Sequence, residues 1–177
     1  MSLDFKFEKK LRKSGYRTIF GIDEVGVGPL AGKVTATAVT FPVKLKIKNE
    51  KLKTRIKNLK DSKKLTPHKR EEFFDFFTKG LGMFWATASV SPKTIDKINI
   101  FEARKLASKR AALKLEKILG KPASILVLDG NARINLKREQ ITIVRGDEKV
   151  ISCAVASIIA KVTRDREMMR YHKIYPE

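Results

Sequence analysis

The sequence contains very little cysteine and histidine, and each shortage excludes a class of site. Cys153 is the single cysteine, so no disulfide can form within the chain and no zinc site can be built from cysteines. It lies in an apolar run, where a buried and unreactive thiol is expected. The two histidines, His68 and His172, lack the spacing of metal ligands, which argues against a zinc centre.

Long hydrophobic runs are also absent. No apolar stretch reaches the length of a transmembrane helix, and residues 1–13 have no uncharged core of the signal-peptide kind. We therefore expect a cytoplasmic protein with no membrane partner. At 177 residues, 42% of them hydrophobic, the chain is long enough for one real core, so we expect a single domain over residues 1–177.

Acidic residues are scarce as well. The 19 Asp and Glu face 39 Lys and Arg, which gives a net charge of +20 that must lie mostly on the surface. A polyanionic partner is indicated, and nucleic acid is the leading candidate because phosphate contacts release counterions. Simple solubility is the alternative, and charge alone does not decide between them.

Two of the few acids, Asp23 and Glu24, are adjacent and lie between an apolar strand and a glycine-rich turn over residues 20–32. Neighbours on a regular strand point to opposite faces, so the two can share a site only if the strand ends there and the backbone rotates. Gly26 and Gly28 permit that rotation. A solvated turn is the alternative interpretation.

Two further acids follow predicted strands later in the chain. The apolar run 124–128 reads as a strand covered on both faces, and Asp129 comes directly after it. A short strand over 141–144 precedes Asp147, which lies where a helix begins. Periodicity predicts the other elements, which are strands over 16–23, 34–41 and 83–90, helices over 4–13, 67–80 and from 149 onward, and one or two helices over 94–119.

These patterns predict an α/β fold whose strand ends carry carboxylates. In the helix 94–119, Phe101 and Leu113 are expected among the side chains that face inward. Carboxylates brought together repel one another unless a cation lies between them, and hard oxygen ligands favour Mg²⁺ or Mn²⁺. Two such ions can activate water and stabilise a leaving 3′ oxygen, so metal-dependent phosphodiester chemistry is indicated.

Five sequence blocks carry a family resemblance. They are GIDE at 21–24 with GPLAG at 28–32, LKDSKKL at 59–65, IDKINI at 95–100, DGN at 129–131, and GD at 146–147 followed by ASIIAKVTRDR at 156–166. In this order they resemble the type 2 ribonucleases H, the ribonuclease HII family. The resemblance implies a ribonuclease H-like fold with a mixed central sheet, three antiparallel strands plus parallel strands, flanked by helices.

The resemblance also implies an activity and a set of site residues. The family cuts the RNA strand of RNA/DNA hybrids and nicks duplex DNA at embedded ribonucleotides, leaving a 3′ hydroxyl and a 5′ phosphate. A monomer using two Mg²⁺ or Mn²⁺ ions is expected. The positions that match catalytic, metal-binding carboxylates are Asp23, Glu24, Asp129 and Asp147, and those that match substrate-binding residues are Gly26, Val27, Gly28, Ser62 and Lys63.

The chain departs from the family pattern at two places. The family usually has Gly-Arg-Gly where this chain has Val27 between two glycines, so a guanidinium able to hold a phosphate or a carboxylate is missing. The sequence also stops at Glu177, before the family's usual C-terminal tail with its substrate-stacking tyrosine. We expect an intact hydrolytic centre with weakened selectivity for single embedded ribonucleotides.

Two other functions stay open. A hybrid-binding protein with impaired catalysis would retain the fold and the positive charge, although all four acids are present. A different metal nuclease or a strand-transfer enzyme on the same fold would explain the acids but not the Asp-Ser-Lys-Lys block.

Overall fold

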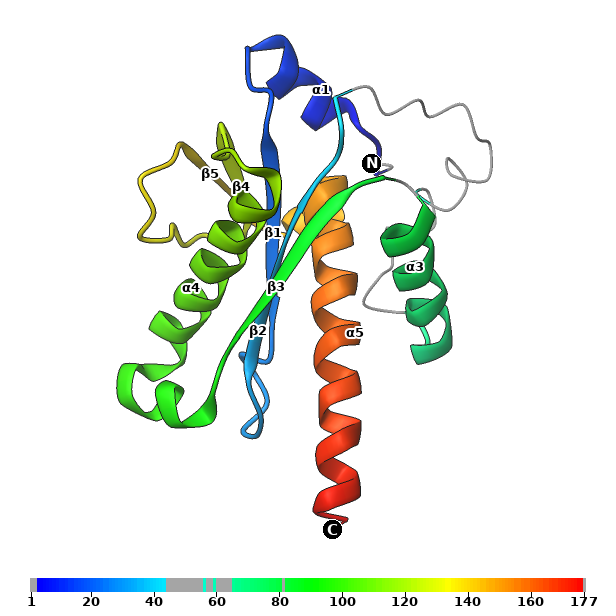
Figure 1. The fold of residues 1–177 in the computed structure, drawn as a ribbon, viewed down its shortest axis with the longest axis vertical. Helices are drawn as coiled ribbons and strands as arrows, with labels where there is room; N and C mark the ends of the chain where they lie inside the picture. Colours follow the sequence, from blue (N-terminus) through cyan, green and yellow to red (C-terminus); the bar gives the residue numbers. More distant parts are fainter. Residues whose placement is uncertain (1–2, 44–55, 57–58, 60–64, 81, 177) are drawn as a thin grey trace.

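The computed structural model describes residues 3–43, 56, 59, 65–80 and 82–176 (Figure 1). The elements are α1 (Lys6–Lys13), β1 (Ile19–Val25), β2 (Val34–Thr40), α3 (Pro67–Gly80), β3 (Phe84–Val90), α4 (Pro92–Leu119), β4 (Ile125–Asp129), β5 (Gln140–Ile143), the 3-10 turn η2 (Gly146–Glu148) and α5 (Ile151–Ile174). The helices and strands predicted from periodicity are confirmed within a few residues. Over the described ranges, no helix has the length and apolar character needed to cross a membrane.

The strands form one mixed sheet in the order β3-β2-β1-β4-β5. β1 pairs antiparallel with β2, and β2 pairs antiparallel with β3. On its other side β1 pairs in parallel with β4, which pairs in parallel with β5. The predicted α/β architecture is therefore confirmed, and β1 lies where the antiparallel and parallel halves of the sheet meet.

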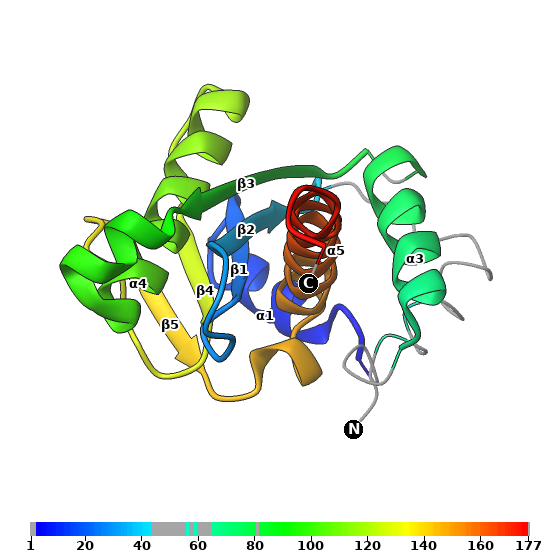
Figure 2. The same ribbon diagram turned by 90° about the horizontal axis from the view of Figure 1, so that it is seen from below.

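Helices cover both faces of the sheet (Figure 2). α4 packs on one face, and α5 packs on the other, where its first half is buried nearly all round. α3 adds a second layer outside α5, with Phe73 and Phe77 in the shared core. Cys153 of α5 is a buried free thiol, as expected, and burial raises the pKa of that thiol well above its usual value.

Many of the α4 side chains that pack on the sheet are small. The buried positions of the helix include Ala103 and Ala107, which lie in one core cluster with Ala36 and Ala38 of β2. Small residues let the helix approach the sheet closely, and large ones at its margins are displaced outward. The expectation that Phe101 and Leu113 face inward is therefore wrong, because these side chains are 48% and 41% exposed.

α4 is interrupted near its start. Asn99 has φ 64° and ψ 165°, which is not helical, so the element consists of two helical segments. The Asn99 side-chain oxygen accepts a hydrogen bond from the backbone N–H of Glu102 at 3.0 Å. Asn99 thus caps the longer second segment, and that segment ends at Gly120 in the left-handed conformation.

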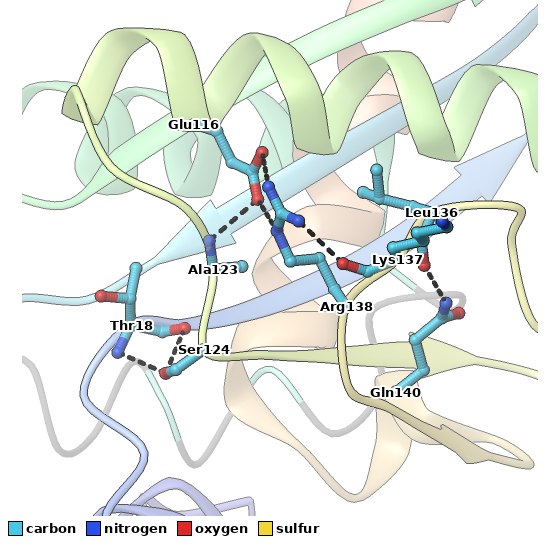
Figure 3. Close-up of polar contacts among 8 residues, drawn as sticks. All are labelled: Thr18, Glu116, Ala123, Ser124, Leu136, Lys137, Arg138 and Gln140. Atoms are coloured by element: carbon cyan, nitrogen blue, oxygen red, sulfur yellow. Dashed lines mark hydrogen bonds and ion pairs between the residues drawn. The ribbon is translucent and has the colours of Figure 1, made fainter.

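The start of β4 is fixed beside the start of β1 by side-chain contacts (Figure 3). The Thr18 N–H donates to the Ser124 hydroxyl at 2.8 Å, and that hydroxyl donates to the Thr18 carbonyl at 3.0 Å. The Glu116 carboxylate accepts from the Ala123 N–H at 2.9 Å and from Arg138 Nε at 2.8 Å. These bonds connect α4, β4 and the segment before β5, and they set where the parallel pair begins.

Candidate active site

The site lies where β1 and β4 separate. Their parallel pairing runs from Ile19 opposite Ile125 to Ile22 opposite Leu128 and then stops, which leaves Asp23 just beyond the last pair. Asp129 follows Leu128 in the same way at the end of β4. Carboxyl ends of adjacent parallel strands open a crevice at a sheet edge, and ligands of α/β proteins bind in such crevices.

β1 does not end at the two acids, so that part of the prediction is wrong. The antiparallel partner β2 holds the strand until Val25 opposite Thr35, with Asp23 opposite Thr37 and Glu24 opposite Ala36. The acids therefore keep the alternation of a strand: Asp23 interacts with Ser157 of α5, and Glu24 with Arg104 of α4. They meet because the crevice between β1 and β4 is open to both sides.

Asp23, Glu24 and Asp129 line one open cavity of about 420 Å³. The Asp23 side chain is almost buried, since the residue is 6% exposed, and its Oδ1 accepts a hydrogen bond from the Glu24 N–H at 2.8 Å. Ser157 and Val27 contribute to the walls. The structure thus brings together three of the four predicted carboxylates.

The surroundings of Asp23 and Glu24 disfavour the ionised forms of their carboxyl groups. Burial raises the pKa of Asp23 well above its usual value, and Asp129 raises it further, while a hydrogen bond with Ser157 acts in the opposite direction. Burial also raises the pKa of Glu24 to about 7; Arg104 lowers it and Asp129 raises it. Both groups hold protons more tightly than in water, and a cation in the cavity would reverse this.

The fourth predicted acid, Asp147, lies behind the others. The N–H of Gly146 donates to Asp129 Oδ1 at 2.6 Å, so η2 contacts the end of β4. A Cβ atom on Gly146 would lie 3.3 Å from Asp129, so a larger residue there would require Asp129 to shift by a few tenths of an ångström. Asp147 itself is 1% exposed and is not part of the cavity wall.

The donor set fits a hard divalent cation, because carboxylate oxygens are the ligands that Mg²⁺ and Mn²⁺ prefer. Three carboxylates line one cavity, and two of them have pKa values raised partly by the third. Among the residues that the structure describes, no group of three or more acidic, histidine or cysteine side chains yet surrounds a common point. The chemistry of the donors matches the expected ion, and a bound cation would have to draw them closer.

Comparison with known proteins identifies the family. The sequence profile described as Ribonuclease HII matches residues 20–177. The chain belongs to the ribonuclease HII family. Ribonuclease HII of Geobacter sulfurreducens is 43% identical over 170 residues, which are 96% of this chain and 72% of that protein. The enzyme of Caldicellulosiruptor saccharolyticus is 41% identical over 172 residues, or 97% and 77% of the two chains.

A solved relative agrees with the fold. The ribonuclease H2 from Pyrococcus horikoshii matches with a TM-score of 0.69 at 27% identity, over 90% of this chain and 78% of that one. The expected ribonuclease H-like fold is therefore confirmed. Membership in the ribonuclease HII family makes the protein a type 2 ribonuclease H, a hydrolase of the class that acts on RNA/DNA hybrids.

The substrate-binding positions expected from the ribonuclease HII resemblance differ in their placement. Val27 lines the cavity beside the carboxylates. Gly26 has φ +91°, and a Cβ atom there would lie 2.5 Å from the Lys33 carbonyl, so the turn requires glycine. Gly28 has open space around it and is exposed. Ser62 and Lys63 lie outside the described residues, so their role stays a prediction.

Sequence reasoning missed several polar residues in the cavity wall. These are Arg70, Arg104, Ser157 and Lys161. Ser157 and Lys161 lie within the block at 156–166 that carries the ribonuclease HII resemblance, which is a signal that could have found them. Arg104 is in none of the five blocks, and only the structure reveals its position.

Proposed function

We propose that this ribonuclease HII family member is a divalent-metal-dependent endoribonuclease. It hydrolyses the RNA strand of RNA/DNA hybrids and cuts at ribonucleotides embedded in duplex DNA, leaving a 3′ hydroxyl and a 5′ phosphate. The observation that carries the proposal is the convergence of Asp23, Glu24 and Asp129 on one open cavity. A net charge of +20 supports a nucleic-acid duplex as the substrate.

Three carboxylates would hold the cation, with Asp147 in support behind them. Bound there, Mg²⁺ or Mn²⁺ supplies an activated water and stabilises the leaving 3′ oxygen. Ser157 stabilises the ionised form of Asp23, and the Gly146 N–H fixes the orientation of Asp129. These contacts limit the orientations of two of the carboxylates that would hold the cation.

Selectivity is proposed to be weaker than the family pattern implies. Val27 presents an apolar side chain to the cavity at the position where the family usually has arginine. A long hybrid offers phosphate contacts along its whole length, whereas a single ribonucleotide depends on contacts at one junction. We therefore expect the long hybrid to be the better substrate. A monomeric state and a cytoplasmic location stay predictions.

The test is a cleavage assay with end mapping. A long RNA/DNA hybrid and a DNA duplex with one ribonucleotide are incubated with the protein and Mg²⁺ or Mn²⁺, and the new 5′ ends are identified. The control is Asp129→Asn, whose side-chain oxygen can still accept from the Gly146 N–H. It should bind the hybrid without cutting it.

Two outcomes would contradict parts of the proposal. Tight hybrid binding by the wild type with no cleavage under either ion would favour a binding protein that has lost catalysis. Equal or faster cleavage of the single-ribonucleotide duplex would refute the weakened selectivity and leave the nuclease activity standing.

A further inference from the structure

Arg104 brings a guanidinium to the carboxylates from the opposite side to α5. Its side chain extends from α4 into the cavity wall and is 21% exposed. The nearest guanidinium nitrogen is 3.7 Å from Glu24 Oε1. This distance is within the range of an ion pair but too long for a hydrogen bond.

The other cations of the cavity each donate at least one hydrogen bond, although Arg70 Nε has no partner among the described residues. Arg70 donates to the Leu65 carbonyl at 2.5 Å and lies 3.7 Å from Asp165. Lys161 donates to Asp165 at 2.7 Å. Within the part of the chain that the structure describes, the Arg104 guanidinium donates no hydrogen bond, so none of its five N–H donors is used by a described residue.

The fold holds Arg104 in place without using those donors. Asn99 caps the second segment of α4, and Arg104 follows in its second turn. Side chains of a helix lean toward its N-terminus, which here directs Arg104 toward the interruption. The guanidinium carbon lies 5.0 Å from the centre of the Phe101 ring, so the aromatic face supports the cation and leaves its edge open.

We propose that Arg104 binds a backbone phosphate of the nucleic-acid substrate, supplying from α4 the guanidinium that the turn over residues 26–28 lacks. Val27 and Arg104 line the same cavity, so an apolar side chain in the turn leaves room for a cation from the helix. A guanidinium suits this role because it can contact two phosphate oxygens at once. The inference rests on the proposed function, and it makes Arg104 a substrate-binding residue.

A purely local role for Arg104 would predict different contacts. A permanent partner of Glu24 should approach to hydrogen-bond distance, as Lys161 approaches Asp165. The separation of 3.7 Å keeps Arg104 near the carboxylate while its N–H groups stay unused. A phosphate entering the cavity would find them free.

The test measures hybrid binding without divalent ions, so that it is independent of cleavage. Dissociation constants for an RNA/DNA hybrid are determined by fluorescence anisotropy in EDTA over a series of salt concentrations. Each phosphate contact contributes about 0.9 to the slope of log affinity against log salt. Arg104→Gln should lower that slope by about 0.9 and weaken binding about tenfold at 0.1 M salt.

Two variants serve as controls. Lys117→Gln removes the same charge from an exposed position about 20 Å along the same helix and should leave the slope unchanged. Arg104→Lys keeps the charge but not the planar fork, so it should retain the slope and bind more weakly. Thermal unfolding of each variant shows whether the fold is intact.

A second substitution is designed to supply the phosphate contact from the turn over residues 26–28 instead of from α4. Val27→Arg in the Arg104→Gln background should recover the slope of the wild type. A wild-type slope in Arg104→Gln alone would overturn the inference, and so would a double variant that behaves like Arg104→Gln. Failure of the proposed function is distinguishable, because the wild type would then bind the hybrid without cleaving it in the presence of Mg²⁺ or Mn²⁺, whereas the salt slopes are measured without cleavage.

Discussion

Two buried carboxylates beside α5 show how different a structural acid and a site acid are. Glu8 of α1 is 3% exposed, and its Oε1 accepts hydrogen bonds from both the N–H and the hydroxyl of Ser152, each at 2.9 Å. Asp23 of β1 is 6% exposed and lies farther along α5, where its partner is Ser157. Burial is the largest cause of the raised pKa of both groups.

The two carboxyl groups differ in the other neighbours that shift their pKa values. Bonds from Ser152 and the charge of Arg12 lower the pKa of Glu8 and so oppose the burial effect. For Asp23, the charges of Asp129 and Glu24 add to it. A carboxylate with a structural role is buried among donors, whereas carboxylates buried against one another are unfavourable until a cation arrives.

The largest expected effect follows from neutralising the site acid. Asp23→Asn should lower cleavage by about 100- to 1,000-fold or more, because one ligand is lost. Its unfolding midpoint without metal should be unchanged or higher, since a repulsive charge disappears. Single-turnover cleavage and urea unfolding measure the two effects. Glu8→Gln is the matched control, and a comparable loss of activity in that variant would erase the contrast between the two acids.

The second prediction concerns pH and the metal-free protein. The pKa of Glu24 is raised from 4.5 to about 7, so the folded state binds the proton more tightly. The stability from this group is fully present below about pH 4.5 and is lost as pH rises through 7. The change is at most about 3 kcal/mol. Urea midpoints at pH 5 and pH 8 in EDTA measure it, and Glu24→Gln should make the difference smaller.

That pH dependence has a specific counter-test. Asp23 and Glu8 contribute changes of the same sign, so Glu24→Gln removes only its own share. Added Mg²⁺ should restore stability at pH 8, where the carboxylates are ionised, more than at pH 5. Equal stabilisation at both pH values would contradict the assignment of these groups as ligands.

The third prediction tests the structural role of Glu8. Glu8→Ala leaves the N–H and hydroxyl of Ser152 without their acceptor at the start of α5. We expect the free energy of unfolding to fall by about 2 kcal/mol, while cleavage per folded molecule is retained. Glu8→Gln keeps an acceptor oxygen and should lose less. A loss of cleavage without a loss of stability would place Glu8 among the functional residues.

The smallest effect is expected at Ser157. Its hydrogen bond lowers the pKa of Asp23, so Ser157→Ala should raise that pKa further and weaken cation binding about tenfold. The pH at which cleavage reaches half its maximum should therefore increase. Thr163→Ala is the control, because its hydroxyl is bonded within the helix to the Ile159 carbonyl. Identical pH profiles for both variants would count against this role of Ser157.

The sequence was informative where a residue's role follows from its own neighbours. An apolar run followed by Asp129 predicted a strand end, and the glycines after Asp23 and Glu24 predicted a turn. The directions in which the Asp23 and Glu24 side chains point depend on the pairing of β1 with β2, and the local sequence did not predict them. β2 extends β1 to Val25, so the two acids point to opposite faces.

The sequence also did not predict which of these side chains are buried and which are exposed. Asp147 was expected beside the other carboxylates at a strand end, but it is buried behind Asp129. Phe101 resembles a core residue, yet the alanines of α4 occupy the face toward the sheet. Arg104 reaches the cavity because the helix restarts at Asn99. Periodicity allowed two helices over 94–119 but did not predict where the break lies.

The two hydrogen bonds between Thr18 and Ser124 join positions 106 residues apart in the chain. The parallel pair that it begins cannot form until the intervening segments have found their places, because contacts of such long sequence separation close slowly. We therefore expect enzymatic competence to return only in the last phase of refolding, after the helices have formed. Recovery of cleavage would then report completion of the whole molecule.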